Sequence, residues 1–308
     1  MEKDFMLKDR KTPLPLFVTL DAHEGRLGNR MFMTAALIGI ARKNNRTPIL
    51  FDAGLTLDCF EGLALEVASQ AEILDNNSIG NYDAILREEG CCIFNNATEN
   101  LAHSKWANKT IALGGYLQSW RYFDNIRDEI RRIFTFKRSI YEAAKIAILN
   151  GIDPLINRSA TILQNQRTIP KIIGIHVRRG DILLDPHKSG GQVPATEEYL
   201  LSTVLEYQAK YSPAIFVVVS QDSDYCRKLF TRDHFIFIEN TSAEIDMAIM
   251  SLMDEMIMTV GSYSFWGAYL NEQATDVTYY KNWPRPKSKL ANQTHAQDYF
   301  LPTWHGRI

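Results

Sequence analysis

Residues 172–181 read Ile172-Ile-Gly-Ile-His-Val-Arg-Arg-Gly-Asp181, and this stretch decides the fold. Its first six residues are almost continuously apolar, which is typical of a strand in a parallel sheet that is buried on both faces. Two adjacent arginines and an acid follow at the point where the strand ends. Because parallel α/β sheets bind ligands beyond the carboxyl ends of their strands, we expect the chemistry of the protein here.

The sequence after this strand repeats the pattern of apolar runs and helical segments. Thr196 can cap a helix beginning at Glu197, whose acidic first turn suits the helix dipole. Strands that alternate with helices predict an α/β fold with a parallel sheet. The expected strands are 214–219, 235–238, 256–260 and 277–280, and the expected helices are 197–211, 223–230, 244–253 and 265–270.

The sequence before residue 150 also opens as a strand–helix–strand unit, with a strand at 17–20, a helix at 31–42 and a strand at 49–51. Weaker strands are expected at 92–94 and 111–113, and a helix with an apolar core stripe at 119–134. Gly151 and Pro154 lie in a polar stretch, 150–168, which we interpret as a domain boundary. The expected parts are a mobile arm (1–16), an N-terminal domain (17–155) and a C-terminal domain (156–308).

Composition excludes two classes of protein. The 308 residues carry a formal net charge of −2, which argues against a protein that binds nucleic acid by neutralising phosphates. The longest nearly apolar run, 31–41, is well short of the ~20 residues that span a bilayer. We therefore expect no nucleic-acid partner and no contact with a membrane except through an anchor outside this chain.

Two features bear on the cellular compartment. The four cysteines are too few for a disulfide scaffold, and either buried thiols or one or two bridges fit them. The glycosylation triplet Asn-x-Ser/Thr occurs more often than the roughly two copies that chance predicts. This excess favours the lumen of the secretory pathway. The acceptor asparagines are Asn45, Asn76, Asn96, Asn108, Asn157, Asn240 and Asn292.

Two loops and the arginine pair are suited to binding an anion. Gly25-Arg-Leu-Gly-Asn29 joins a strand to a helix but lacks the spacing of a dinucleotide-binding loop. Ser262-Tyr-Ser264 precedes an aromatic helix, and it is either a phosphate cradle or a cap on a core helix. Arg178 and Arg179 should point to opposite sides, so that one binds phosphate while the other pairs with Asp181 or a second group. A solvated edge with a surface ion pair is the alternative.

A third strand end carries Asp222-Ser-Asp224. The spacing matches the DxD that holds a divalent metal in many glycosyltransferases, but it occurs by chance about once in a chain of this composition. We favour Asp222 as a hydrogen-bonding residue and Asp224 as part of the first turn of a helix.

Five motifs in register make the sequence resemble the α-1,2-fucosyltransferases, the galactoside 2-α-L-fucosyltransferase family, over residues 17–305. They are Gly25-Arg-Leu-Gly-Asn29 with Met31-Phe32, Ser119-Trp-Arg-Tyr-Phe123 with Ile130-Arg-Arg-Ile-Phe134, His176-Val-Arg-Arg-Gly-Asp181, Met258-Thr-Val-Gly261 with Phe265-Trp-Gly-Ala-Tyr-Leu270, and Phe300-Leu-Pro-Thr-Trp304.

The resemblance implies an inverting enzyme that moves L-fucose from GDP-β-L-fucose to the 2-hydroxyl of a terminal galactose on a β-galactoside glycan in the Golgi lumen. It implies two Rossmann-like domains facing a cleft (GT-B-like), with the acceptor on the N-terminal domain and the donor on the C-terminal one. No metal or other cofactor is expected, because arginine can stabilise the charge of the diphosphate leaving group. The open alternatives are a metal-dependent transferase that uses Asp222 and Asp224, and a glycan-binding module without activity.

The resemblance also assigns roles to individual residues. Arg178 or Arg179 would stabilise the leaving diphosphate, Ser262 and Ser264 would complete the phosphate site, and Asp222 would contact the guanosine. The general base is left open among His23, Glu24 and Asp181. The remaining residues of the expected donor site are His176, Phe265, Trp266, Gly25, Arg26, Gly28 and Asn29.

Overall fold

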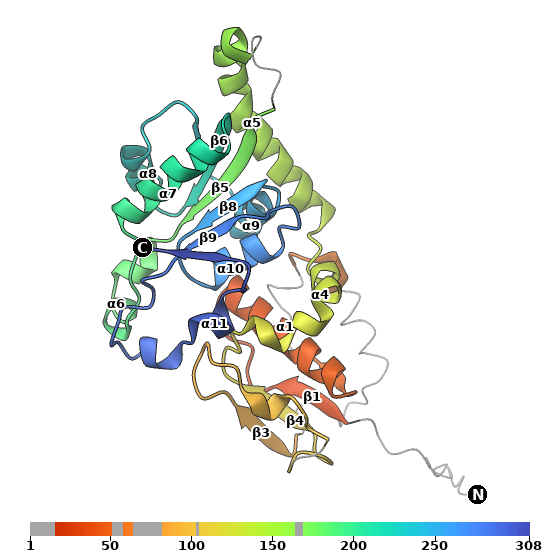
Figure 1. Cartoon of the computed structure of the whole chain (residues 1–308). Helices are drawn as coiled ribbons and strands as arrows, with labels where there is room; N and C mark the ends of the chain where they lie inside the picture. Colours follow the sequence, from red (N-terminus) through yellow and green to blue (C-terminus); the bar gives the residue numbers. More distant parts are fainter. Residues whose placement is uncertain (1–15, 51–57, 64–81, 103–104, 164–168) are drawn as a thin grey trace, which may run out of the picture.

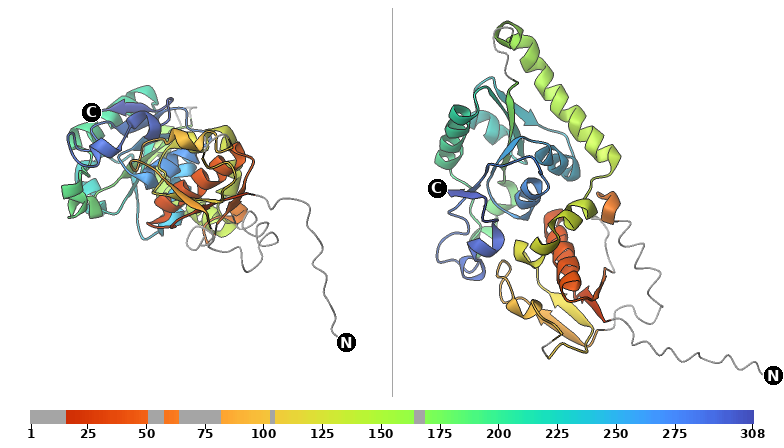
Figure 2. Two further views of the ribbon diagram at one scale, coloured as in Figure 1. Left: turned by 90° about the horizontal axis from the view of Figure 1, so that it is seen from below. Right: turned by 45° about the vertical axis from the view of Figure 1, so that its right-hand side comes forward.

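The computed structural model of the protein describes residues 16–50, 58–63, 82–102, 105–163 and 169–308. Two parallel sheets, each with its own helices, lie one beyond the other along the length of the molecule (Figures 1 and 2). This confirms the expected α/β class with two parallel sheets. Except for Leu16, the expected N-terminal arm lies outside the described residues.

The smaller sheet has the strand order β2-β1-β4-β3, and all of its pairs are parallel. The expected strand at 49–51 is found at Thr47–Ile49, and the expected strand at 92–94 is wrong, because only an isolated bridge joins Cys92 to Thr294 there. Its strands are β1 (Phe17–Leu20), β2 (Thr47–Ile49), β3 (Ala84–Arg87) and β4 (Ile111–Gly114), and helix α1 (Leu27–Lys43) connects β1 to β2.

The larger sheet has the strand order β10-β9-β8-β5-β6-β7, again with parallel pairs only. The apolar strand expected at 172–177 is β5, and it lies inside this sheet. Its strands are β5 (Lys171–Val177), β6 (Ala214–Ser220), β7 (Phe235–Ile238), β8 (Glu255–Met258), β9 (Val277–Tyr280) and β10 (His305–Arg307).

The helices around the larger sheet are α6 (His187–Gly190), α7 (Glu197–Lys210), α8 (Ser223–Leu229), α9 (Ala243–Ser251), α10 (Ser262–Tyr269) and α11 (Ala296–Tyr299). The expected cap is confirmed, since the Thr196 side chain accepts a hydrogen bond of 3.2 Å from the backbone N–H of Tyr199. The expected single helix over 119–134 is instead two 3-10 turns, Trp120–Tyr122 and Asp124–Ile126, followed by α4 (Arg127–Ile133).

The stretch 150–168, which we interpreted as a domain boundary, is helical as far as Leu163, and residues 164–168 lie outside the described residues. Helix α5 (Arg138–Leu163) continues through Pro154, so the proposed boundary between residues 155 and 156 falls inside a helix. Figure 1 shows α5 running along the side of the larger sheet, and it packs on α9 and β7. The helix is stable there because tertiary packing outweighs the hydrogen bond that proline cannot donate.

The two halves share one core at the place where α1 meets α10. Phe32 of α1 contacts Phe265 and Trp266 of α10, with ring centroids 4.5 Å and 5.2 Å apart. Phe123, from the smaller half, stacks on Trp266 at 5.6 Å. This aromatic contact fixes the N-termini of both helices close together.

Three further expectations concern the chain as a whole. Its four cysteines form no disulfide, although the Cys91 and Cys92 sulfurs lie only 2.8 Å apart. None of the described helices is long and apolar enough to span a membrane. Asn76 lies outside the described residues, as does the side chain of Asn157. The other sequon asparagines, Asn45, Asn96, Asn108, Asn240 and Asn292, are exposed.

Candidate active site

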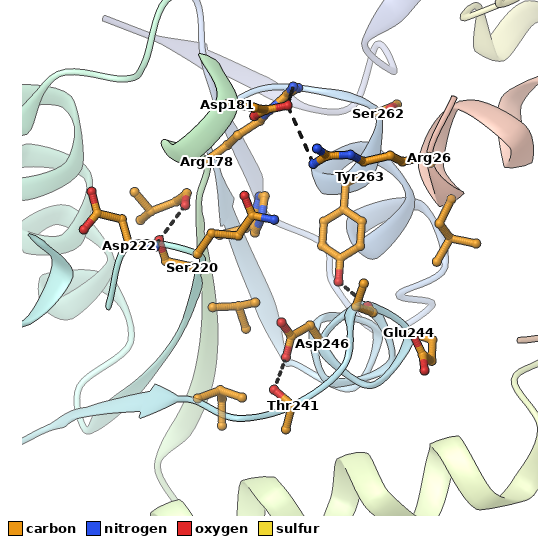
Figure 3. Close-up of a pocket in the computed structure, with 18 of the residues that line it drawn as sticks. Arg26, Arg178, Asp181, Ser220, Asp222, Thr241, Glu244, Asp246, Ser262 and Tyr263 are labelled. Atoms are coloured by element: carbon orange, nitrogen blue, oxygen red, sulfur yellow. Dashed lines mark hydrogen bonds and ion pairs between the residues drawn. The ribbon is translucent and has the colours of Figure 1, made fainter. Parts of the chain in front are cut away.

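A cavity of about 1050 Å³ opens at the carboxyl ends of β5, β6 and β7, beside the N-termini of α1 and α10. This is the edge where the sequence predicted the site. Figure 3 shows Arg178, Asp181, Arg26 and Ser262 at one end of the cavity and Thr241, Glu244 and Asp246 at the other, with Tyr263 between them. We call these the cationic end and the acidic end.

Arg178 and Asp181 form the centre of the cationic end. The Arg178 guanidinium donates hydrogen bonds of 3.4 Å and 3.1 Å to the two oxygens of Asp181, and Arg26 Nη1 lies 3.7 Å from the same carboxylate. Gly261 has a φ of +95°, and a Cβ there would lie 2.3 Å from Arg178 Nη1. Glycine at 261 therefore leaves room for the Arg178 guanidinium.

Two helix N-termini meet at this end. Neither α1 nor α10 has a side-chain cap, and an uncapped first turn of a helix can offer backbone N–H groups to an anion. Asn29 Oδ1 joins them by accepting a hydrogen bond of 2.6 Å from the Ser262 hydroxyl. A Cβ on Gly28 would lie 2.8 Å from the backbone of Ser262, so this glycine allows the two helices to approach each other.

Arg179 points to the other side of the strand, as expected. Its Nε donates a hydrogen bond of 3.0 Å to Asp222 Oδ2, and its guanidinium lies 3.7 Å from the centre of the Tyr225 ring. Asp222 Oδ1 accepts from the Tyr225 N–H and thereby caps α8, and Asp224 lies in the first turn of that helix. Asp222 lines the cavity, but Arg179 does not. Of the arginine pair, Arg178 is the one that lines the cavity.

Three residues that the sequence predicted to contact the donor are buried in the structure instead. Ser264, Phe265 and Trp266 are completely buried and do not line the cavity. Trp266 Nε1 donates to the carbonyl of Gly28. The Ser264 and Phe265 side chains also lie in the core, because α10 packs against α1 and α9. The interpretation of this segment as an aromatic core helix is confirmed for these residues, and only Ser262 and Tyr263 face the cavity.

His176 lines the cavity but is only 7% exposed, and its Nδ1 contacts the Ser264 hydroxyl. Burial and the charge of Arg178 lower the pKa of His176 to about 3. The imidazole is therefore neutral near pH 7 and does not add positive charge to the cationic end.

Of the three candidates for the general base, only Asp181 lines the cavity. His23 turns toward α1, where its Nε2 contacts the Thr34 hydroxyl and the Arg30 carbonyl at 3.2 Å each, and Glu24 is exposed outside the cavity. Burial raises the pKa of Asp181, but Arg178 and Arg26 outweigh this effect and lower the pKa overall. Asp181 is consequently an ionised carboxylate that can accept a hydrogen bond.

The acidic end is absent from the sequence expectations. Asp246, on the first two turns of α9, accepts a hydrogen bond of 2.5 Å from Thr241, and burial raises its pKa to about 6 despite this bond. Glu244 lies on the same wall, and the Tyr263 hydroxyl donates to the carbonyl of Ala243. Within the described residues, no group of three or more His, Cys, Asp and Glu side chains is placed to hold a metal ion.

Two parallel α/β units with a cavity at their junction define the class of protein, a two-sheet fold with Rossmann-like halves. The chain belongs to glycosyl transferase family 11, whose model matches residues 63–307. The resemblance found in the sequence is thus confirmed at the level of the family.

Similar proteins agree with this assignment. Galactoside alpha-(1,2)-fucosyltransferase 1 of Mus musculus is 28% identical over 290 residues, which cover 92% of this chain and 70% of that protein. Galactoside alpha-(1,2)-fucosyltransferase 2 of Hylobates lar is 29% identical over 292 residues, which cover 92% of this chain and 77% of that protein. Among solved structures, POFUT1 in complex with GDP-fucose has a TM-score of 0.51 at 9% identity and covers 86% of this chain and 97% of that one. The fucosyltransferase NodZ from Bradyrhizobium has a TM-score of 0.50 at 13% identity, and the match covers 83% of this chain and 92% of that one. This chain shares the fold of both solved structures.

Proposed function

We propose that the protein transfers L-fucose from GDP-β-L-fucose to the 2-hydroxyl of a terminal β-galactose, with inversion at the fucose C1. The observation that carries this proposal is the meeting of Arg178 with two uncapped helix N-termini at one end of the cavity. Such a site suits a leaving group with two phosphates. The names of the similar proteins supply the sugar and the linkage.

The two ends of the cavity suit the two ends of a guanosine diphosphate sugar. The diphosphate binds at the cationic end, where arginine and backbone N–H groups supply positive charge without a metal ion. The guanine binds toward the acidic end, because its N1–H and N2 amino group are donors and Asp246 is a partly buried acceptor there. Asp222, already held by Arg179 and Tyr225, lines the cavity between the strand ends.

In the proposed reaction, the bond between fucose C1 and the β-phosphate oxygen breaks and its electron pair stays on the phosphate. The Arg178 guanidinium and the first turns of α1 and α10 stabilise the charge that develops. The galactose 2-hydroxyl attacks C1 from the opposite face and forms the new C–O bond. Its proton passes to a general base, for which His23, Glu24 and Asp181 remain the candidates, and the support for Asp181 is that it lines the cavity.

We also propose that the protein works in the Golgi lumen, where exposed sequons would carry glycans. The support is the excess of sequons and the exposure of five of their asparagines. Protein secreted from a eukaryotic host should run faster in electrophoresis after enzymatic removal of N-glycans. Unchanged mobility would contradict the lumenal assignment.

The function is tested by incubating the protein with a panel of sugar nucleotides and methyl β-galactopyranoside. We expect transfer from GDP-fucose, a product whose new linkage is to O2 by NMR, and an α-anomeric fucose. Transfer from another sugar nucleotide, or to another hydroxyl, would overturn the donor or the linkage. Binding of galactosides without any transfer would favour a glycan-binding module.

A further inference from the structure

Tyr116 is an exposed aromatic residue that lines the cavity, as Tyr263 does from the larger half. The residue is 38% exposed and lines the cavity from the smaller half of the molecule. Its hydroxyl makes no hydrogen bond with the described part of the chain. A tyrosine that lines a cavity and is more than a third exposed has aromatic surface available to a ligand.

The turn that carries Tyr116 is held in place from both sides. The half-buried carboxylate of Glu88 accepts hydrogen bonds from the backbone N–H groups of Tyr116 at 2.6 Å and Leu117 at 3.0 Å. Gly115 has a φ of +114°, and Leu117, which is completely buried, has a φ of +52° that is rare for a residue with a side chain. Backbone in such a conformation persists only where its surroundings fix it, and it clusters at ligand sites.

Hydrogen bonds also connect this turn to the cationic end. Gln118 Nε2 donates to Asn29 Oδ1 at 3.0 Å, and the same oxygen accepts from Ser262 at the start of α10. Tyr116 therefore lies two residues from a side chain that contacts the helix N-termini, in the half of the molecule that holds the smaller sheet. The acidic end, toward which the guanine binds, is formed by residues of the larger-sheet half such as Thr241 and Asp246.

We propose that the ring of Tyr116 is the platform on which the acceptor sugar lies, with the C–H face of the pyranose against the aromatic face. This inference rests on the proposed function. The attacking hydroxyl must reach C1 of the fucose, which is bonded to the diphosphate, so the acceptor has to bind beside the cationic end. A galactose ring has a face of axial C–H groups, and such a face packs on an aromatic ring while the hydroxyls remain in the polar cavity.

The test compares three variants with the unchanged protein, with methyl β-galactopyranoside as the acceptor. Tyr116→Ala should raise the acceptor KM about tenfold, because the ring face is lost, while the Kd for GDP changes less than twofold. Tyr116→Phe keeps the ring and should recover most of the affinity for the acceptor. Tyr141→Ala, on α5, removes a tyrosine of similar exposure and is the matched control, with an acceptor KM that should not move.

A second measurement does not depend on the folding of a variant. Saturation of the aromatic protons of the unchanged protein should transfer to the axial protons of one face of the methyl galactoside. Absence of this transfer, or an unchanged acceptor KM in Tyr116→Ala, would overturn the inference, and so would a Tyr116→Phe variant as impaired as Tyr116→Ala. If the unchanged protein transfers no fucose to galactosides, the proposed function fails instead, and saturation transfer to other pyranosides then decides the role of Tyr116.

Discussion

The two ends of the cavity differ in charge and in how the chain builds them. The cationic end is assembled from residues at the end of a central strand and in the first turns of two helices, with Arg178 and Asp181 three residues apart. The acidic end takes Asp246 from within a helix and Thr241 from the turn before it. The first arrangement follows from the rule that parallel sheets bind ligands at their carboxyl edge. The second depends on which side of α9 faces the cavity.

The largest effect should come from the cationic end and should separate two neighbouring residues. Arg178→Lys should lower kcat with GDP-fucose about 100-fold or more, because a lysine cannot reproduce the forked guanidinium. Arg179→Lys is the matched variant, and it should cost about tenfold or less, because Arg179 does not line the cavity and contacts Asp222 and Tyr225 instead. Steady-state kinetics with GDP-fucose measures both.

Near-normal turnover of Arg178→Lys would remove this residue from the phosphate site. A larger loss in Arg179→Lys than in Arg178→Lys would mean that the two arginines exchange places when the donor binds. The Kd for GDP, measured for each variant, shows whether a loss lies in donor binding or in the chemical step.

The acidic end should control the choice of nucleotide base. Asp246→Asn should weaken the binding of guanosine about tenfold, because one carboxylate oxygen becomes a donor facing the donors of guanine. Adenosine, which lacks those donors, should bind equally weakly to both proteins. Equal affinity of the variant and the unchanged protein for guanosine would place the base elsewhere in the cavity.

The Asp246 carboxyl should make the affinity for guanosine depend on pH. Burial raises the pKa of Asp246 to about 6, so the carboxyl is largely protonated at pH 5 and largely ionised at pH 7. The ionised form is the better acceptor, so guanosine affinity should rise as the pH rises through 6. Guanosine itself has no phosphate that titrates in this range. The rise should disappear in Asp246→Asn, and a rise of the same size in the variant would assign it to another group.

The sequence predicted the larger sheet more accurately than the smaller one. Strands β5 to β9 are buried and continuously apolar or nearly so, so each one is visible as a short run. The strands that were missed lack this signal. Strand β10 (His305–Arg307) is a polar, exposed strand at the edge of the sheet, and β3 (Ala84–Arg87) is short and only partly buried. Both exist because a neighbouring strand supplies hydrogen bonds, which sequence periodicity does not report.

The residues of the candidate site also divide into those that the sequence predicted and those that it missed. Arg178, Asp181, Asp222 and Ser262 lie at strand ends or helix starts, and the sequence rule located all of them. Ser264 belongs to the same segment as Ser262 but points into the core, because successive helical residues are about 100° apart around the axis. Tyr116 and Asp246 reach the cavity only through the packing of Glu88 against a turn and of α9 against the larger sheet. The positions of Tyr116 and Asp246 therefore depend on tertiary packing.

The smallest expected effect concerns a divalent metal. Charge on the leaving diphosphate has to be met at the cationic end, and Arg178, Arg26 and two helix N-termini are available for it. Of the two DxD carboxylates, Asp222 caps α8 and accepts from Arg179, and Asp224, which also lines the cavity, lies in the first turn of that helix.

We therefore expect turnover with GDP-fucose to survive excess EDTA, with a change of less than about twofold. Asp224→Ala should keep most of the activity. The Asp224 carboxylate interacts favourably with the dipole of a short helix, which stabilises the protein by about 0.3–1 kcal/mol. Asp222→Ala should weaken donor binding more, because it removes the cap of α8, worth about 1 kcal/mol, and frees Arg179. Activity that is lost in EDTA and restored by manganese or magnesium would assign the phosphate charge to a metal ion, and the cationic end would then be only part of the donor site.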